Sequence, residues 1–199
     1  MSNSHISKSI YQLDVSPPEF LGQVAQDIKC DIAIIGGGLT GISTALSLGE
    51  KGYDVCLFEA GKIGDGGSGR NGGQICQGWS SGFEKLSKYI DTEFKKDMWQ
   101  VGIEGPNLIN ERIKKYNIEC DIQWGYVHTA IHTGHMRDLE EYQKTFEAHG
   151  YSKLRALENK SLLFDYVRSD AYIGGLYDAG SGHLHPLKYL IGISNAAEN

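Results

Sequence analysis

Apolar residues follow two different periods in the first third of the chain, and these periods predict its secondary structure. An apolar run at 31–35 is followed by helically spaced apolar residues over 39–52 and by a β-rich run at 53–58. Two strands joined through a helix are expected to pair in parallel, as in a βαβ unit. The pattern therefore predicts an α/β fold built around a parallel sheet.

Five further elements are predicted beyond residue 90 from the same patterns. They are a helix over 92–117, a strand over 122–131, a helix over 135–149, a strand over 171–178 and a helix over 186–197. A kink is expected at Gly105-Pro106. Residues 1–29 carry several serines and Pro17-Pro18 without a sustained period, which predicts an extended arm on the surface.

Three glycines lie where the first predicted strand meets its helix. Gly36, Gly38 and Gly41 form the pattern G-x-G-x-x-G, and Glu59 ends the second strand 18 positions after Gly41. In this context the pattern predicts binding of the ADP half of NAD or FAD. The glycines would allow a tight turn, close approach of a diphosphate and close helix packing, and Glu59 would accept hydrogen bonds from a ribose. An ordinary glycine turn with a solvated Glu59 is the alternative.

A second glycine-rich segment follows, with eight glycines between positions 61 and 78. Within it, Arg70 offers a guanidinium for phosphate charge, and Ser68 and Asn71 offer hydrogen bonds. The alternative for Arg70 is a surface arginine paired with Asp65. Such a segment has no place in a plain NAD-binding domain, so it favours FAD.

Four stretches of the sequence together resemble one family. GGGLTG at 36–41, FEAGKIG at 58–64, GGSGRNGGQ at 66–74 and DAGSGHLHPL at 178–187 resemble the D-amino-acid-oxidase-type flavoproteins. Within these flavoproteins they are most similar to gamma-glutamylputrescine oxidase and related amine oxidases. The resemblance covers about residues 30–199.

The resemblance implies FAD as cofactor, with the stretch from Ser68 to Gln74 running along the diphosphate, the ribityl chain and the ring. No catalytic residue is assigned. The positions of this sequence expected to bind FAD are Gly36, Gly38, Leu39, Thr40, Gly41, Glu59, Ala60, Ser68, Gly69, Arg70, Asn71, Gly72, Gly73 and Gln74.

The resemblance also implies the reaction and the domains. The reaction is oxidation of the C–N bond of a small amine or amino acid, with oxygen as acceptor. The expected domains are an arm at 1–29, a Rossmann-like FAD-binding domain at 30–120, the first part of an α+β substrate domain at 121–177, and a return to the FAD-binding domain at 178–199. We expect a truncated chain that is inactive alone and that a second chain could complement. A non-catalytic FAD- or ADP-binding module and a degraded remnant are the alternatives.

Composition and charge bear on the possible partners of the chain and on its cellular setting. The net charge is -6 with scattered charges, which disfavours nucleic-acid binding. No apolar run is long enough to span a membrane, and no secretory signal is evident. Cys30, Cys56, Cys76 and Cys120 form neither a C-x-x-C motif nor a disulfide scaffold, and they fit a reducing cytoplasmic setting in which thiols are buried.

The histidines are not expected to bind a metal. His128, His132 and His135 lie across a predicted strand, a turn and a helix start, so solvated or capping roles are favoured. His183 and His185 precede Pro186, where packing in the loop and at the helix N-terminus is favoured over a functional role.

Overall fold

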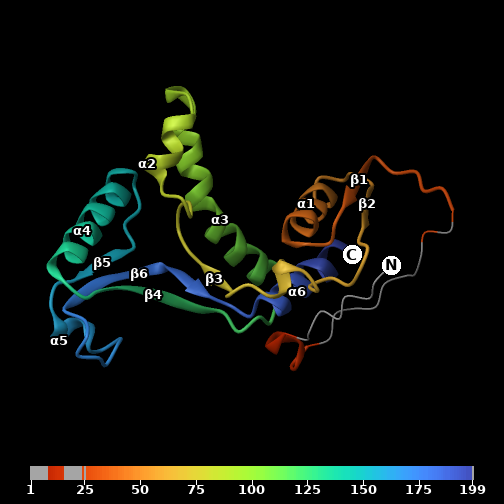
Figure 1. Ribbon diagram of the computed structural model, residues 1–199. Helices are drawn as coiled ribbons and strands as arrows, with labels where there is room; N and C mark the ends of the chain where they lie inside the picture. Colours follow the sequence, from red (N-terminus) through yellow and green to blue (C-terminus); the bar gives the residue numbers. More distant parts are fainter. Residues whose placement is uncertain (1–8, 16–23, 25, 199) are drawn as a thin grey trace, which may run out of the picture. The chain divides into compact units, whose positions relative to one another are not determined.

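The computed structural model describes residues 9–15, 24 and 26–198, and the chain divides into two compact units. Unit 1 comprises 1–73, 110–122 and 184–199, and unit 2 comprises 74–109 and 123–183. Figure 1 shows the elements of both. The predicted domain boundaries divide the chain differently and, as functional domains, stay a prediction.

Unit 1 contains the predicted βαβ unit. Strand β1 (Ile32–Ile35) leads through helix α1 (Leu39–Gly49) to strand β2 (Val55–Phe58). The two strands are parallel, with Ile32 opposite Val55, which confirms the prediction. Helix α1 packs on one face of this pair, whereas Ile35 on the opposite face is 83% exposed.

The remaining elements of unit 1 support the βαβ unit. Helix α6 packs beside α1 and buries Leu187, Leu190 and Ile193. The bounds of these elements are Ile10–Gln12 for the 3-10 helix η1, Gly67–Gly69 for the 3-10 helix η2 and Pro186–Glu198 for α6. The predicted extended arm lies largely outside the described residues, and its described part includes the short 3-10 helix η1.

Unit 2 is built on an antiparallel sheet in which the long strand β6 pairs with three partners. Helix α4 packs on this sheet, and the aromatic core of the unit includes Trp99, Phe146 and Tyr151. The strands are β3 (Gln74–Ile75), β4 (Gln123–Ala130), β5 (Leu154–Leu157) and β6 (Gly174–His183).

Unit 2 also contains helices on either side of β4 in the sequence, of which α3 is the longest. Helix α3 continues through Pro106 as one helix, and its last residues, from position 110, belong to unit 1. The bounds are Phe83–Leu86 for α2, Ser87–Tyr89 for η3, Thr92–Phe94 for η4, Lys95–Lys115 for α3, Thr133–Ala148 for α4 and Lys160–Leu163 for α5.

The predicted strand at 171–178 is shifted toward the C-terminus in the structure. Strand β6 runs to His183, through Gly180 and Gly182, which lie beyond the end of the predicted strand. A Cβ atom at Gly182 would overlap the main-chain carbonyl of Gln123, so glycine lets the neighbouring strand approach. The glycines here therefore mark close strand packing and not a turn.

Arg112 links the end of α3 to α1 within unit 1. Its side chain is 5% exposed, and it donates hydrogen bonds of 2.6 Å to Ser43 Oγ and 2.7 Å to Ser47 Oγ. We expect Arg112→Met, which keeps the aliphatic stem, to lower the free energy of unfolding by about 1–3 kcal/mol. Urea unfolding measures this loss. Arg137→Met, at an exposed position of α4, is the control, and an equal loss in both variants would contradict the role assigned to Arg112.

Candidate cofactor-binding site

The turn between β1 and α1 is held by the end of β2. Gly36 N donates a hydrogen bond of 2.7 Å to Phe58 O, and Gly36 adopts a φ of 104°, a conformation that side chains disfavour. A Cβ atom at Gly41 would overlap the carbonyl oxygen of Gly36. Glycine at both positions therefore allows the chain to turn sharply from the strand into the helix.

The N-terminus of α1 presents amides at this turn. Gly38 is the N-cap residue, and the first helical hydrogen bond runs from Ile42 N to Gly38 O over 3.0 Å. The amides of Leu39, Thr40 and Gly41 therefore precede the helical hydrogen-bond ladder. Such amides, together with the helix dipole, favour an anion such as a diphosphate.

The Glu59 carboxylate lies beside the same turn. Its Oε2 accepts a hydrogen bond of 2.6 Å from Gly37 N, and its Oε1 accepts one of 2.8 Å from Gly61 N. These hydrogen bonds from Gly61 and Gly37 lower the pKa of Glu59. A carboxylate has about four acceptor positions, so it can still accept hydrogen bonds from a ribose.

The two hydrogen bonds of Glu59 predict a pH-dependent contribution to stability. Because the pKa is lowered in the folded state, the contribution is present above the ordinary value of 4.5 and is lost as the pH falls through the lowered pKa. We expect the difference in Tm between the wild type and Glu59→Gln to be larger at neutral pH than in acid. Thermal unfolding followed by circular dichroism at both pH values measures this difference, and a difference independent of pH would contradict the assignment.

Ser68 connects the second glycine segment to the helix N-terminus. Its Oγ accepts a hydrogen bond of 2.9 Å from Leu39 N. The loop containing 3-10 helix η2 therefore lies at the first turn of α1, within the same unit. The sequence predicted a polar role for Ser68 but did not predict this partner, which lies 29 positions away.

Asn71 organises the second glycine segment from within. Its Oδ1 accepts a hydrogen bond of 2.8 Å from Gly73 N, and its Nδ2 donates one of 2.9 Å to Ser68 O.

The Arg70 Nε donates to the main-chain carbonyl of Asp65 over 2.7 Å, whereas the Asp65 carboxylate accepts from Gln12. The contact between Arg70 and Asp65 that the sequence offered as an alternative therefore exists, but through the main chain.

The other predicted cofactor residues lie at different places in the fold. Ala60 follows Glu59 at the end of β2, Gly69 is buried against Gly64, and Gly72 follows Asn71. Gln74 begins β3 in unit 2, where it pairs with His183. The structure thus brings the residues of the first motif, Glu59 and Ser68 together in unit 1.

These residues fit the ADP half of a dinucleotide. Gly38 carries no side chain at the helix start, and a Cβ atom there would lie only 3.1 Å from Ser68 Oγ. The donors are main-chain amides suited to phosphate, and the acceptor is a carboxylate suited to ribose hydroxyls. The chemistry of the site therefore agrees with that of the nucleotide.

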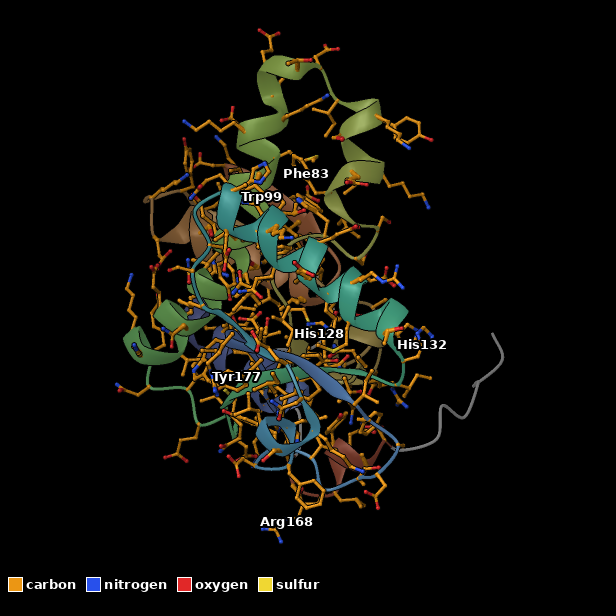
Figure 2. All side chains as sticks on the ribbon, turned by 90° about the vertical axis from the view of Figure 1, so that its left-hand side faces the viewer. Phe83, Trp99, His128, His132, Arg168 and Tyr177 are labelled. Carbon is orange, nitrogen blue, oxygen red and sulfur yellow. The ribbon has the colours of Figure 1, made fainter. Side chains whose placement is uncertain are left out.

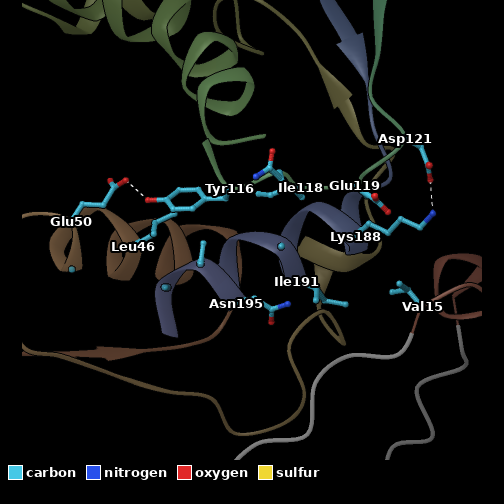
Figure 3. A pocket seen from close by; sticks show the side chains of 15 residues that line it. Val15, Leu46, Glu50, Tyr116, Ile118, Glu119, Asp121, Lys188, Ile191 and Asn195 are labelled. Atoms are coloured by element: carbon cyan, nitrogen blue, oxygen red, sulfur yellow. Dashed lines mark hydrogen bonds and ion pairs between the residues drawn. The ribbon is translucent and has the colours of Figure 1, made fainter. Parts of the chain in front are cut away.

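A separate cavity of about 1010 Å³ lies in unit 1, lined by α1, α6 and the segment around 116–121 (Figure 3). Glu50 accepts hydrogen bonds from Lys115 and Tyr116, and Lys188 pairs with Asp121 over 2.7 Å. None of the predicted cofactor residues lines this cavity. Glu50, Asp121 and Lys188 are thus paired, and the cavity does not extend the nucleotide site.

Two histidines have the capping role that the sequence favoured. His132 Nδ1 accepts from His135 N at the start of α4, and His185 Nδ1 accepts from Lys188 N at the start of α6. Figure 2 shows His132 at one end of α4. Among the residues that the structure describes, no group of three His, Cys, Asp or Glu side chains could hold a metal ion.

The cysteines differ from the expectation of buried thiols. Cys120 is buried, and burial raises its pKa to about 11, but Cys76 is exposed and Cys30 and Cys56 are half-buried. All four are free.

Within 9–15, 24 and 26–198, no helix is long and apolar enough to cross a membrane.

A protein-family model matches most of the chain. The matched family is described as "FAD dependent oxidoreductase" (DAO), and the match covers residues 31–199. This range begins at β1 and includes both glycine segments.

Curated relatives match the same part of the chain. The "Probable oxidoreductase OrdL" of Haemophilus influenzae is 40% identical over 169 residues, which are 83% of this chain and 38% of the relative. The "Gamma-glutamylputrescine oxidoreductase" of Escherichia coli is 38% identical over 171 residues, which are 86% of this chain and 40% of the relative. The chain therefore spans about two fifths of the length of these relatives.

Solved structures share the fold at lower sequence identity. An L-amino acid deaminase from Proteus myxofaciens, in complex with anthranilate, matches with a TM-score of 0.74 and 22% identity, covering 96% of this chain and 40% of that protein. A glycine oxidase from Bacillus cereus matches with a TM-score of 0.62 and 20% identity, covering 85% of this chain and 44% of that protein.

Proposed function

We propose, from the premise that the chain belongs to the FAD dependent oxidoreductase family, that its glycine turn and Glu59 bind the adenosine diphosphate half of FAD. The observation that carries this proposal is the joint position of three groups in unit 1. The first-turn amides of α1, the Glu59 carboxylate and the Ser68 hydroxyl all lie at the turn after β1. The family match begins at the same strand.

Each of these groups has a role in the proposed site. The amides of Thr40 and Gly41 would donate to the diphosphate, and the absence of a side chain at Gly38 would let it approach. The Glu59 carboxylate, oriented by Gly37 and Gly61, would accept from the ribose hydroxyls. Arg70 would contribute positive charge near the phosphates.

We further propose that the reaction is oxidation of the C–N bond of a small amine or amino acid, with oxygen as acceptor. The curated relative in Escherichia coli is named a gamma-glutamylputrescine oxidoreductase, which supports an amine substrate. When bound, FAD would supply the electron acceptor. The residues of this chain would bind and orient the cofactor, and no catalytic residue is assigned among them.

FAD binding is tested on the purified chain. Titration of apoprotein into FAD, followed by quenching of flavin fluorescence, should give saturable one-to-one binding. ADP should compete with FAD, because the proposed contacts belong to the ADP half. A chain that is folded by circular dichroism but leaves the fluorescence of FAD unchanged would contradict the proposal.

Amine oxidation is tested separately on the FAD-loaded chain. Gamma-glutamylputrescine, putrescine, sarcosine and glycine are added, and flavin absorbance is followed without oxygen and peroxide release with oxygen. Reduction by one of these amines supports the proposed reaction. Bound FAD that none of them reduces would instead favour a non-catalytic FAD-binding module.

The setting and partners are part of the same proposal. The four free cysteines support a reducing compartment such as the cytoplasm. The exposed Ile35 on the open face of the β1–β2 pair supports association with a complementing chain. Sedimentation velocity of the FAD-loaded chain tests for such association.

A further inference from the structure

A cluster of one arginine and two tyrosines lies on the antiparallel sheet of unit 2. Arg155 on β5 is opposite Tyr177 on β6 in the strand register, so the two side chains share a face of the sheet. Tyr166 follows α5 in the sequence, and its ring lies 4.9 Å from that of Tyr177 between centroids. All three residues belong to unit 2, so the cluster is complete within one compact unit.

The cluster lies on the face of the sheet that is turned away from α4. A Cβ atom at Gly174 would contact Met136 of α4, whereas one at Gly175 would contact Leu163 of α5. Successive residues of a strand point to opposite faces, so Tyr177 shares the face of Gly175. Figure 2 marks the position of Tyr177 on the sheet below α4.

The guanidinium of Arg155 is held by both tyrosines. Its central carbon lies 5.4 Å from the ring centroid of Tyr177 and 5.6 Å from that of Tyr166, and its Nη2 donates a hydrogen bond to the Tyr166 hydroxyl. Aromatic rings attract a guanidinium at such distances. The long side chain is therefore already restricted, and a ligand that bound it would lose less conformational entropy.

The neighbouring strand is distorted where it passes Tyr177. A β-bulge lies between Trp124 and Tyr126 of β4, and Gly125 has a φ of 108°. A Cβ atom at Gly125 would lie only 2.8 Å from the Tyr177 hydroxyl oxygen. Bulges often redirect a strand beside a functional site. Here the bulge and its glycine make room for a tyrosine that supports Arg155.

Arg155 is an exposed residue with donors left over. A guanidinium has five N–H groups, and Tyr166 accepts from Arg155. Within the part of the chain that the structure describes, no carboxylate forms an ion pair with Arg155. Tyr166 is itself 40% exposed. The cluster therefore presents a fixed positive charge beside an aromatic surface that solvent can reach.

We propose that this cluster binds the carboxylate of a small organic acid. The planar edge of a guanidinium matches the two oxygens of a carboxylate, which it can bind through two parallel hydrogen bonds. The cluster holds a single positive charge, which suits a monoanion better than a doubly charged phosphate. The exposed part of the Tyr166 ring would contact the apolar part of the acid.

Phenylacetate, phenylacetamide and inorganic phosphate are the probes that test this site, at low ionic strength and without FAD. Phenylacetamide has the shape of phenylacetate without its charge. Titration followed by 15N-edited NMR should move the Nε–H signal of Arg155, which Arg155→Lys assigns. Phenylacetate should bind about tenfold more tightly than phenylacetamide or phosphate. An Arg155 signal that phenylacetate does not move up to its solubility limit, or equal binding of the acid and the amide, would overturn the proposal, and so would tighter binding of phosphate.

Two substitutions of Arg155 separate its charge from its shape. Arg155→Lys keeps the charge but loses the planar pair of donors, and it should weaken phenylacetate binding about fivefold. Arg155→Met keeps the aliphatic stem and should bind acid and amide equally weakly. Arg137→Lys, at an exposed position of α4, is the matched control and should bind as the wild type does. If Arg155→Met, folded by circular dichroism, still prefers the acid over the amide, the proposal is wrong.

Discussion

Replacing Gly38 by valine should abolish FAD binding while leaving the chain folded. Gly38 is the N-cap of α1, and even a Cβ atom there would lie 3.1 Å from Ser68 Oγ. The additional methyl groups of valine would occupy the space through which a diphosphate reaches the helix amides. We expect an affinity loss of about a hundredfold or more, which corresponds to roughly 2.7 kcal/mol. Quenching of flavin fluorescence measures the affinity.

Gly49→Val is the matched control for this variant. Gly49 ends the same helix, and a Cβ atom there would contact nothing within 4 Å. Its FAD affinity should equal that of the wild type. If Gly38→Val and Gly49→Val both bind FAD as tightly as the wild type does, the diphosphate does not bind at Gly38 and the proposed site is wrong.

Replacing Gly73 by alanine should cause the largest loss of stability among single changes in the glycine segments. Gly73 has a φ of 65°, and a Cβ atom there would overlap the carbonyl oxygen of Leu184. The backbone strain costs about 1–2 kcal/mol and the forced displacement about 1–3 kcal/mol. We expect the free energy of unfolding to fall by about 3 kcal/mol and the Tm by roughly 6–12 °C.

Thermal and urea unfolding of Gly73→Ala and Gly67→Ala test this expectation. Gly67 lies in the same segment, and a Cβ atom there would meet nothing within 4 Å. Gly67→Ala should therefore unfold within about 0.5 kcal/mol of the wild type. A small loss of stability in Gly73→Ala would mean that the contact between Gly73 and the Leu184 carbonyl can adjust without strain.

The parts of the fold that the sequence predicts well have strong local patterns. The apolar run of β1, the helical spacing of α1 and the glycines between them are set within about thirty residues of one another. The parallel pairing follows because a helix joins the two strands. Glu59 was found for the same reason, since it directly follows β2.

The missed parts depend on partners that are distant in the sequence. Strand β5 has the sequence Leu-Arg-Ala-Leu, which is too short to show a period, and it exists because it pairs with β6. The extension of β6 through Gly180 and Gly182 depends on β3 and β4 as neighbours. Likewise, the polar character of Ser68 was visible in the sequence, but its hydrogen bond to Leu39 follows from how the loop folds back.

The hydrogen bonds that orient Glu59 have a consequence for nucleotide selection. Because Gly37 and Gly61 hold both carboxylate oxygens, the negative charge cannot easily swing away from the proposed ribose position. A phosphate on the 2′-hydroxyl of an adenosine would meet this charge directly and be repelled, whereas an unmodified ribose would find acceptors. The same contacts that stabilise the turn would thus discriminate against 2′-phosphorylated dinucleotides.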